Sequence, residues 1–350
     1  MIKILYVAYP LLTVSEESAG GAEQVLWTLE REMMRRGYGT AVAASCGSRI
    51  SGELLCTGAP SSEVDDFERR NREHQDKAVE FIRARRFDLV HDMSGSFWPR
   101  AVEIDVPVLA TLHLPRHFYS QSLFRDVPEN VRFNCVSQSQ ARNFTDLDAM
   151  IGVVANGIAL DRFAAKKSER KGLLWLGRIC EEKAPHLALD IAERAGLPIT
   201  IAGQVYPFSY HQQYFDREIA PRLLATPEAT FVPSPPFEVK RKLLAEAQAV
   251  LITSLVDETS SLVAMEAAAC CTPVVAFSRG ALPDIVRDGV TGFLVDAVDQ
   301  AVQALKKLTR ITRHACLDHA RAQFTSARMG IGYGKMYERL SREGTPLLVA

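Results

Sequence analysis

Two acidic residues, Glu258 and Glu266, are separated by seven residues and follow an apolar run at residues 249–254. The run is rich in β-branched residues and ends in small polar ones, which is typical of a buried strand. Residues 264–269 are strong helix formers. The pattern predicts a strand, a loop and a helix, with Glu258 on the loop and Glu266 about two turns into the helix.

This order of elements places two carboxylates near the start of a helix. We expect Thr259 or Ser260 to be the N-cap, because a side-chain hydroxyl accepts a hydrogen bond from the free amides there. The remaining amides and the partial positive charge of the helix N-terminus favour an anion such as a phosphate. Two glutamates of a solvated surface helix would give the same local pattern, so the pair alone does not distinguish a phosphate site from an ordinary surface helix.

Three ordered motifs follow the glutamates. They read CTPVVAF at residues 271–277, RGALPDIV at 279–286 and DGVTGFLV at 288–295. Together with the glutamate pair, this stretch resembles the retaining glycosyltransferases of family 4. In that family E-x7-E runs into G-T-P-V-V-A and then G-x-x-E-I-V-x-D-G-x-T-G-x-L-V.

The sequence departs from the family pattern in three places. Ser260 and Ser261 stand where an aromatic residue and a glycine are usual, Cys271 replaces the glycine before Thr-Pro, and Asp284 replaces a glutamate. We interpret the serine pair as a modified donor pocket, because it keeps small side chains and adds hydroxyl donors near a phosphate.

The resemblance covers residues 2–340 and implies a fold and an activity. The fold is GT-B, in which two Rossmann-like lobes with parallel sheets face each other across a cleft and the C-terminal helix crosses back to the first lobe. The activity is retaining transfer of a sugar from a nucleotide-diphosphate sugar to an acceptor hydroxyl. The family pattern implies neither a metal ion nor a cofactor for this reaction.

The resemblance also assigns roles to single residues. Arg178 and Lys183 would bind the donor diphosphate, the first as a planar fork and the second as a compact charge. Glu258 would bind hydroxyls of the donor sugar, and Glu266 the ribose diol. The other donor-binding candidates are Gly20, Gly21, Gly203, Thr259, Ser260, Ser261 and Leu262.

A catalytic histidine is expected in the first lobe. His113 ends the apolar segment 106–112, and ligands of open α/β sheets bind at the carboxyl ends of parallel strands. The resemblance favours His113 as the catalytic residue that holds the transferring group, with His117 as the alternative. Gly20 and Gly21 lie in the first strand-to-helix loop, where a plain turn is an equally good interpretation because the G-x-G-x-x-G pattern is absent.

The remaining sequence alternates between predicted strands and helices. The strands cover residues 2–8, 40–44, 87–91, 106–112, 172–178, 199–203, 230–232 and 249–254. The helices cover residues 23–36, 63–86, 186–195, 264–269, 298–308, 314–324 and 326–342. We therefore expect an acceptor-side domain at 1–165, a nucleotide-sugar-binding domain at 170–325 and a helix at 326–350 that returns to the first domain. The charged segment 166–170 joins the domains.

Composition sets further bounds. A chain of 350 residues with 47% hydrophobic residues exceeds one ordinary core, and a net charge of -1 argues against a nucleic-acid partner. Seven cysteines without metal-type spacing are interpreted as buried thiols of a cytoplasmic protein. We expect no leader or membrane-spanning helix, while the basic residues at 35–36 and 83–86 leave peripheral contact with anionic lipid open.

Two other functions stay open at this stage. A nucleotide-sugar 2-epimerase would share the architecture, but E-x7-E together with the N-G-I motif at residues 156–158 is not expected there. A non-catalytic nucleotide-sugar-binding protein is the other alternative, because the serine pair and Cys271 alter the motif. The acceptor, whether a glycan, a lipid or a small molecule, has no signature in the first-lobe loops at 45–65 and 115–126.

Overall fold

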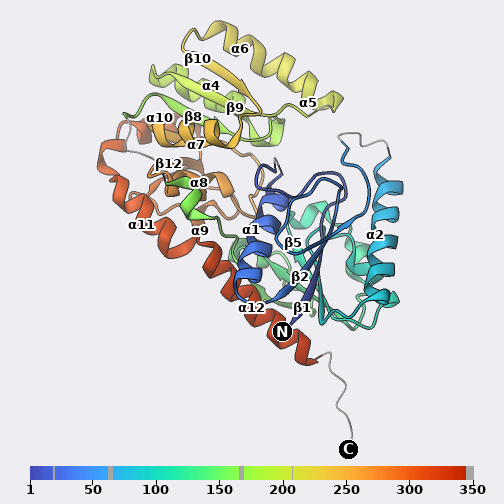
Figure 1. Cartoon of the computed structure of the whole chain (residues 1–350). Coiled ribbons are helices and arrows are strands. Elements are labelled where there is room, and N and C mark those ends of the chain that lie inside the picture. The colour runs from blue at the N-terminus through green and yellow to red at the C-terminus, as the bar shows by residue number, and fades with distance from the viewer. Residues whose placement is uncertain (19, 62–65, 165–168, 207, 344–350) are drawn as a thin grey trace, which may run out of the picture. The chain divides into compact units, whose positions relative to one another are not determined.

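The computed structural model describes residues 1–18, 20–61, 66–164, 169–206 and 208–343. The chain forms two compact units, one made of Met1–Gly157 with the segment from Ser326 onward, the other of Ile158–Thr325 (Figure 1). The first unit thus gives way to the second after Gly157, eight residues before the expected end of the first domain. Most of the expected joint at 166–170 lies outside the described residues.

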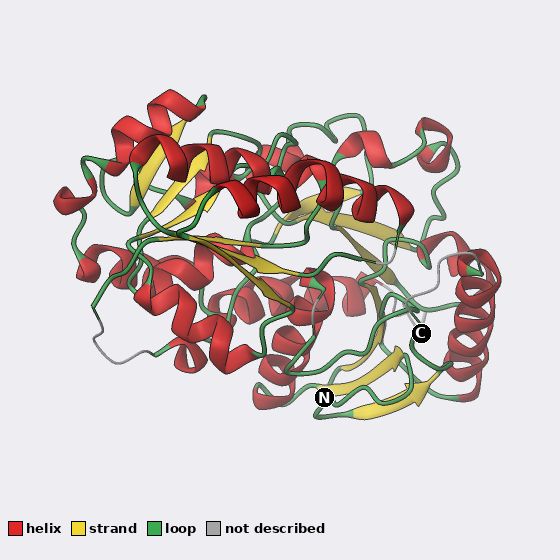
Figure 2. Cartoon of the chain, turned by 90° about the horizontal axis from the view of Figure 1, so that it is seen from above, coloured by secondary structure: helices red, strands yellow, loops and turns green. Residues whose placement is uncertain are grey.

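Seven strands form a parallel sheet in the described part of the first unit, in the order β3-β2-β1-β4-β5-β6-β7. Most of their residues are buried and apolar, as expected for a parallel sheet that is covered on both faces (Figure 2). The strands are β1 (Lys3–Val7), β2 (Gly39–Ala44), β3 (Glu53–Cys56), β4 (Leu89–Asp92), β5 (Val108–Leu112), β6 (Val131–Cys135) and β7 (Met150–Val153).

The α-helices described in this unit are α1 (Gly21–Arg35), α2 (Phe67–Ala84), α3 (Gln138–Ala141) and α12 (Ser326–Glu343). Helix α2 begins later than expected, and residues 63–65 of that prediction lie outside the described residues. Short 3-10 helices, η1 (Trp98–Glu103), η2 (Arg116–Phe118) and η3 (Gln121–Phe124), follow the carboxyl ends of β4 and β5.

The C-terminal helix α12 belongs to the first unit, which confirms the expected return of the chain. A buried network of neutral polar groups fastens it there. The Tyr337 hydroxyl lies 2.7 Å from His91 Nδ1 and 3.3 Å from the Tyr6 hydroxyl. The Tyr333 hydroxyl lies 3.2 Å from Thr111 Oγ1, which is 2.7 Å from His91 Nε2. Both ring nitrogens of His91 are therefore paired inside the core.

Six strands form a second parallel sheet in the other unit, in the order β10-β9-β8-β11-β12-β13. They are β8 (Leu173–Leu176), β9 (Ile199–Gly203), β10 (Ala229–Pro233), β11 (Ala249–Ile252), β12 (Val274–Phe277) and β13 (Gly292–Val295). The α-helices described here are α4 (Pro185–Ala195), α5 (Ser209–Tyr214), α6 (Ala220–Ala225), α7 (Phe237–Glu246), α8 (Leu262–Ala269), α9 (Leu282–Ile285), α10 (Val298–Leu305) and α11 (Arg313–Gln323). Two such Rossmann-like α/β units are the predicted architecture.

Two parts of the chain differ from the sequence expectations. Strand β3 lies in the segment 45–65 that we treated as loop, and α5, α6 and α7 were not predicted. The cysteine interpretation was also wrong in part, because Cys46 and Cys56 form a disulfide. Pairing of β3 with β2 puts Cys56 beside Ala44, close to the loop that carries Cys46. Disulfides persist in oxidising environments, so the cysteines no longer argue for a reducing compartment.

No helix among the described residues is both long enough and apolar enough to cross a membrane.

Candidate functional site

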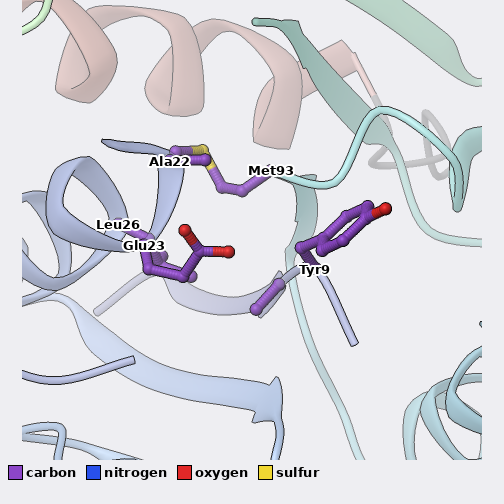
Figure 3. Close-up of a pocket in the computed structure, with 6 residues that line it drawn as sticks. Tyr9, Ala22, Glu23, Leu26 and Met93 are labelled. Atoms are coloured by element: carbon purple, nitrogen blue, oxygen red, sulfur yellow. The ribbon is translucent and has the colours of Figure 1, made fainter. Parts of the chain in front are cut away.

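The glycine loop of the first unit leads into α1. Gly20 is the N-cap, and Gly21 is the first residue of the helix. The carboxyl group of Glu23 lies so close to Gly20 that a Cβ there would overlap Glu23 Oε2. A small pocket lined by Tyr9, Met93 and other residues surrounds this carboxyl, which Figure 3 shows directed into it. A larger residue at position 20 would therefore displace the Glu23 carboxyl from this pocket.

Glu23 is nearly excluded from solvent. Only 5% of its surface is exposed, and burial raises the pKa of its carboxyl above the ordinary value. An acidic group at a helix N-terminus interacts favourably with the helix dipole. The predicted phosphate contact of Gly20 and Gly21 therefore has a protein carboxyl beside it, a feature that the sequence pattern did not indicate.

The two candidate histidines have different surroundings. His113 directly follows β5, as predicted, and burial lowers its pKa to about 4. Its imidazole is neutral at pH 7 as a result. His117 is exposed on η2, with its ring centre 4.5 Å from that of Phe118. A strand-end position and a buried environment distinguish His113 from its alternative.

Two neighbouring strands of the second unit carry the other candidates. Strands β8 and β11 pair directly, so the loops at their carboxyl ends begin side by side. The loop after β8 contains Arg178 and the 3-10 helix η5 (Glu181–Lys183), and the loop after β11 contains Glu258. The sheet order therefore brings together residues that lie 75 positions apart in the sequence.

Lys183 and Glu258 form an ion pair, with Lys183 Nζ 2.5 Å from Glu258 Oε1. Ser254 Oγ donates a hydrogen bond to the same oxygen. The side chain of Lys183 keeps 30% of its surface exposed and that of Glu258 keeps 10%. A cation at this depth can still reach an incoming anion, while the acid is held in place by two donors.

The loop that carries Glu258 is supported by the segment after β12. Gly280 has a φ of 55° and lies against the Glu258 backbone so closely that a Cβ would overlap it. Ala281 N donates to the Glu258 carbonyl at 2.7 Å, and Gly280 N donates to Asp257 Oδ1 at 3.2 Å. The arginine-glycine motif of this segment therefore fixes the backbone of the predicted acid.

Arg178 forms an ion pair of its own, with Nη2 2.8 Å from Glu182 Oε1. Its guanidinium carbon lies 5.9 Å from the centre of the Tyr206 ring. Gly203, at the end of β9, packs on the backbone of Gly177, where a Cβ would overlap the Gly177 carbonyl oxygen. Close approach of β9 to the Arg178 loop is what requires glycine at 203.

The start of α8 differs from the expectation by one or two residues. Ser261 is the N-cap, and its Oγ accepts a hydrogen bond from Ala264 N at 3.3 Å. Neither Thr259 nor Ser260 has this role, so that prediction was wrong. Ser260 Oγ is buried without a hydrogen-bond partner in the structure. The loop therefore presents a hydroxyl, next to the helix start at Leu262, that a ligand oxygen can satisfy.

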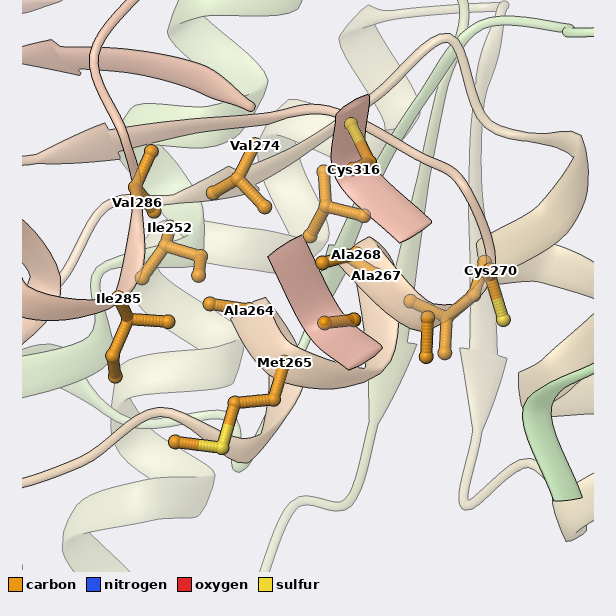
Figure 4. Close-up of a cluster of buried hydrophobic side chains, with 14 of the residues drawn as sticks. Ile252, Ala264, Met265, Ala267, Ala268, Cys270, Val274, Ile285, Val286 and Cys316 are labelled. Carbon is orange, nitrogen blue, oxygen red and sulfur yellow. The ribbon is translucent and has the colours of Figure 1, made fainter. Parts of the chain in front are cut away.

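Glu266 lies about one and a half turns after the N-cap, closer to the helix start than predicted. The other side chains of α8 are apolar, and those of residues 264–269 lie in the core, as Figure 4 shows for Ala264, Ala267 and Ala268. Glu266 is only 3% exposed, and Lys240 Nζ of α7 lies 2.7 Å from its Oε1. Burial of a lone charge would be costly, so Lys240 stabilises the acid.

Lys240 was missed by sequence reasoning. It belongs to a helix rich in lysine and arginine, which has the pattern of a solvated surface. Its ammonium nevertheless lies 5.6 Å from the ring centre of Phe163 and 5.6 Å from that of Phe237. No spacing in the sequence connects Lys240 with Glu266, since the two lie on different helices that meet only in the fold.

Two α/β units of this architecture, with cations and a helix start at the carboxyl end of one sheet, define a GT-B type protein that can bind an anionic ligand. The family model described as Glycosyltransferase Family 4 matches residues 19–162. The model described as Glycosyl transferases group 1 matches residues 159–323. The chain therefore belongs to family 4 of the glycosyltransferases.

Curated relatives include the D-inositol 3-phosphate glycosyltransferase of Mycolicibacterium smegmatis. It is 33% identical over 195 residues, which are 51% of this chain and 44% of the relative. The corresponding enzyme of Mycobacterium marinum is 35% identical over 176 residues, 46% of this chain and 38% of the relative. The chain thus matches less than half the length of these relatives.

Solved structures with the same fold have lower sequence identity. Sucrose-phosphate synthase of Thermosynechococcus elongatus has a TM-score of 0.77 at 18% identity, over 98% of this chain and 100% of that one. HepE of Anabaena, solved with UDP and glucose, has a TM-score of 0.74 at 15% identity, over 97% of this chain and 100% of that one. At these identities the likeness establishes the fold.

Proposed function

We propose that this chain is a retaining glycosyltransferase that moves a sugar from a nucleotide-diphosphate sugar to an acceptor hydroxyl, with the leaving diphosphate stabilised by side chains rather than by a metal ion. The observation that supports this most is the Lys183–Glu258 pair, held by Ser254 at the carboxyl end of β11. The cation, Lys183, suits the anionic diphosphate of a nucleotide sugar. The acid, Glu258, suits the sugar, whose hydroxyl groups donate hydrogen bonds.

The leaving group sets the main electrostatic demand. When the bond from the anomeric carbon to the diphosphate oxygen breaks, negative charge develops on that oxygen, and fixed donors aimed there lower the barrier. Lys183 and Arg178 are the proposed cations, and each is now paired with an acid, Glu258 and Glu182. Donor phosphates would share these cations, and the Ser260 hydroxyl with the amides at the start of α8 would add neutral donors.

The two acids are proposed to bind different parts of the donor. Glu258 accepts hydrogen bonds from hydroxyls of the transferred sugar, and Glu266 accepts from the ribose diol. The pair with Lys240 occupies Oε1 of Glu266, and a carboxylate retains further lone pairs for a diol. Replacing Glu266 by Gln should lower affinity for any ribonucleotide, whereas Glu258→Gln should lower turnover more than affinity for a bare nucleoside diphosphate.

His113 is proposed to act on the transfer step. A neutral imidazole can donate to or accept from a sugar hydroxyl and hold the reacting groups in position, where a small misplacement costs about a hundredfold in rate. His113→Ala should then leave nucleotide binding nearly unchanged and lower transfer by about tenfold to a thousandfold. His117→Ala is the matched control and should be milder.

The first experiment is a screen of nucleotide sugars for diphosphate release. UDP-glucose is the first donor to test, since HepE was solved with UDP and glucose, and inositol phosphate is the first acceptor, given the names of the curated relatives. Product NMR reads the anomeric configuration, and a metal chelator in the assay tests metal dependence. Retention of configuration in the presence of chelator supports the proposal. Inversion contradicts the mechanism, and donor binding without release or transfer would identify a non-catalytic binding protein.

A further inference from the structure

Three side chains with metal-ligating atoms converge in the second unit outside the residues assigned to the donor. They are Cys180 at the start of η5, Glu182 within it, and His211 on α5. One ligand atom from each, a sulfur, a carboxylate oxygen and an imidazole nitrogen, lies within 4.8 Å of the other two. No sequence pattern indicated this cluster, because Cys180 and His211 are far apart in the chain and follow no common metal-ligand spacing.

The histidine of this cluster lacks the partners that a buried imidazole normally has. His211 is 0% exposed, and neither ring nitrogen has a hydrogen-bond partner in the structure. His91, which is equally buried, has both ring nitrogens paired. Leaving a buried polar group unpaired destabilises the folded state, so binding of a ligand to His211 would be favourable. Aromatic rings surround it, with the ring centre of Tyr210 at 4.2 Å and that of Phe208 at 5.3 Å.

We propose that Cys180, Glu182 and His211 form a site for a divalent ion of the zinc class, with a fourth position left for water. A thiolate and an imidazole select zinc and similar transition metals over magnesium or calcium, which prefer oxygen ligands. Tetrahedral zinc needs ligand atoms about 3.4–3.6 Å apart, so the side chains close in by about 1 Å when the ion binds.

The chemistry of each ligand fits this assignment. The buried Cys180 thiol donates a hydrogen bond to the Arg178 carbonyl oxygen, which lies 3.4 Å from its sulfur. Binding of the ion forms the metal–sulfur bond and releases the thiol proton to solvent. Neither ring nitrogen of His211 has a hydrogen-bond partner in the structure, so a ring lone pair is available to an ion. Glu182 can accept the hydrogen bond from Arg178 and bind the ion at the same time, because a carboxylate offers about four acceptor sites.

The proposed ion is separate from the transfer reaction. It joins η5 to α5, and through Glu182 it holds the loop that carries Arg178. The role of the ion is to hold η5 and α5 together. The proposal of this site does not depend on which donor the protein binds.

The experiment uses the full chain without an affinity tag. The protein is produced in zinc-supplemented medium and dialysed, and its metal content is measured by mass spectrometry. The metal-stripped protein is then titrated with Co²⁺, for which thiolate ligation gives a charge-transfer band in the near ultraviolet. We expect about one zinc per chain and a saturating cobalt band. Cys180→Ser and His211→Ala should each weaken cobalt binding by at least about a hundredfold, since each removes a direct ligand.

Matched controls separate this site from other thiols and histidines. Cys271→Ser and His314→Ala change a half-buried cysteine and an exposed histidine of the same unit and should leave metal content unchanged. Absence of bound zinc together with absence of a cobalt–thiolate band in the parent would overturn the proposal without any variant. A band that persists in Cys180→Ser would also overturn it. Neither readout depends on nucleotide binding or sugar transfer.

Discussion

Two groups of polar side chains, one in each unit, differ in charge and in burial. At the carboxyl end of its sheet, the second unit carries ion pairs whose cations are partly exposed, with 30% of Lys183 and 40% of Arg178 accessible. The first unit instead buries neutral groups, among them Tyr6, His91 and Tyr337, each with 0% exposure. These hydroxyls and the imidazole are paired with one another.

The difference follows from the cost of burial. A charged side chain can bind a ligand only where water or the ligand can replace its protein partner. Full burial of an ion pair also carries a large desolvation free energy. Neutral hydrogen bonds lose less on burial and specify one arrangement when every member is satisfied. We infer that the pairs of Lys183 and Arg178 in the second unit are exchangeable contacts for a ligand, whereas the network of Tyr6, His91 and Tyr337 in the first unit is a permanent part of the fold.

The largest effect that would test this contrast is on turnover. Lys183→Ala should lower glycosyl transfer by about a hundredfold or more, because it removes a positive charge from the leaving group and leaves Glu258 without its cation. Steady-state rates at saturating donor measure the effect. Lys242→Ala, an exposed lysine of α7, is the control and should be neutral. Equal turnover in Lys183→Ala and the parent would remove Lys183 from the reaction.

The neutral network should respond in stability. Tyr337→Phe removes one hydroxyl and leaves His91 Nδ1 and the Tyr6 hydroxyl without this partner, so we expect a loss of about 1–3 kcal/mol in unfolding free energy. Urea denaturation followed by circular dichroism measures it. Tyr210→Phe, at a tyrosine with 58% exposure in the second unit, should have little effect. If Tyr337→Phe and Tyr210→Phe were equally stable, the hydrogen bonds of Tyr337 would not stabilise the fold.

The buried histidine His74 should make part of the unfolding free energy depend on pH. Burial lowers the pKa of His74 to about 4. Between pH 4 and 6.5, His74 is therefore mostly protonated in the unfolded chain and mostly neutral in the folded chain. The stability that His74 contributes is therefore present above pH 6.5 and is lost as the pH falls toward 4. Glu23 and Asp92, whose pKa values are raised by burial, act in the opposite direction, so a variant must be compared with the parent.

His74→Gln removes this titration. Its stability deficit relative to the parent, measured by thermal unfolding, should be largest near pH 7.5 and should shrink as the pH falls from 6.5 to 4.5. His117→Gln, at an exposed position, is the matched control and should have nearly the stability of the parent. A deficit of His74→Gln that grew on acidification would show the sign of the argument to be wrong.

The smallest predicted effect concerns Cys271, one of the departures from the family motif. Its φ of 62° lies in the left-handed region, which costs a non-glycine residue about 1–2 kcal/mol. Cys271→Gly should raise the unfolding free energy by about 0.5–1 kcal/mol, after allowing for the greater freedom of glycine in the unfolded chain. The neighbouring Cys270, with φ −80° and a buried side chain, is the control, and Cys270→Gly should destabilise. A less stable Cys271→Gly would contradict this account.

The sequence predicted the elements better than the contacts between them. Apolar runs located β8 and β11, and the sheet order then placed Lys183 beside Glu258, a pair already assigned to one site. Lys240 escaped notice because its pairing with Glu266 depends on how α7 packs, which no local pattern encodes. The N-cap was misplaced because several consecutive hydroxyl residues can all cap, and only the backbone path selects Ser261.

Short elements account for other differences. Strand β3 has four residues, too few for a periodic pattern, and its recognition was a condition for pairing Cys56 with Cys46. The cluster of Cys180 and His211 was missed for a similar reason, because α5 has six residues with mixed polar and aromatic side chains. Local preference is weak over such lengths, so tertiary packing decides.

The return of α12 to the first unit has a consequence for biosynthesis. Since Ile158–Thr325 is inserted between the two segments that build the first unit, the N-terminal sheet emerges from the ribosome long before its last helix. Until α12 arrives, His91 and Tyr6 lack their Tyr337 partner. The second unit can fold as one continuous stretch, whereas the first is complete only after α12 has been made. A change in α12 therefore alters the packing of the part of the protein that was made first.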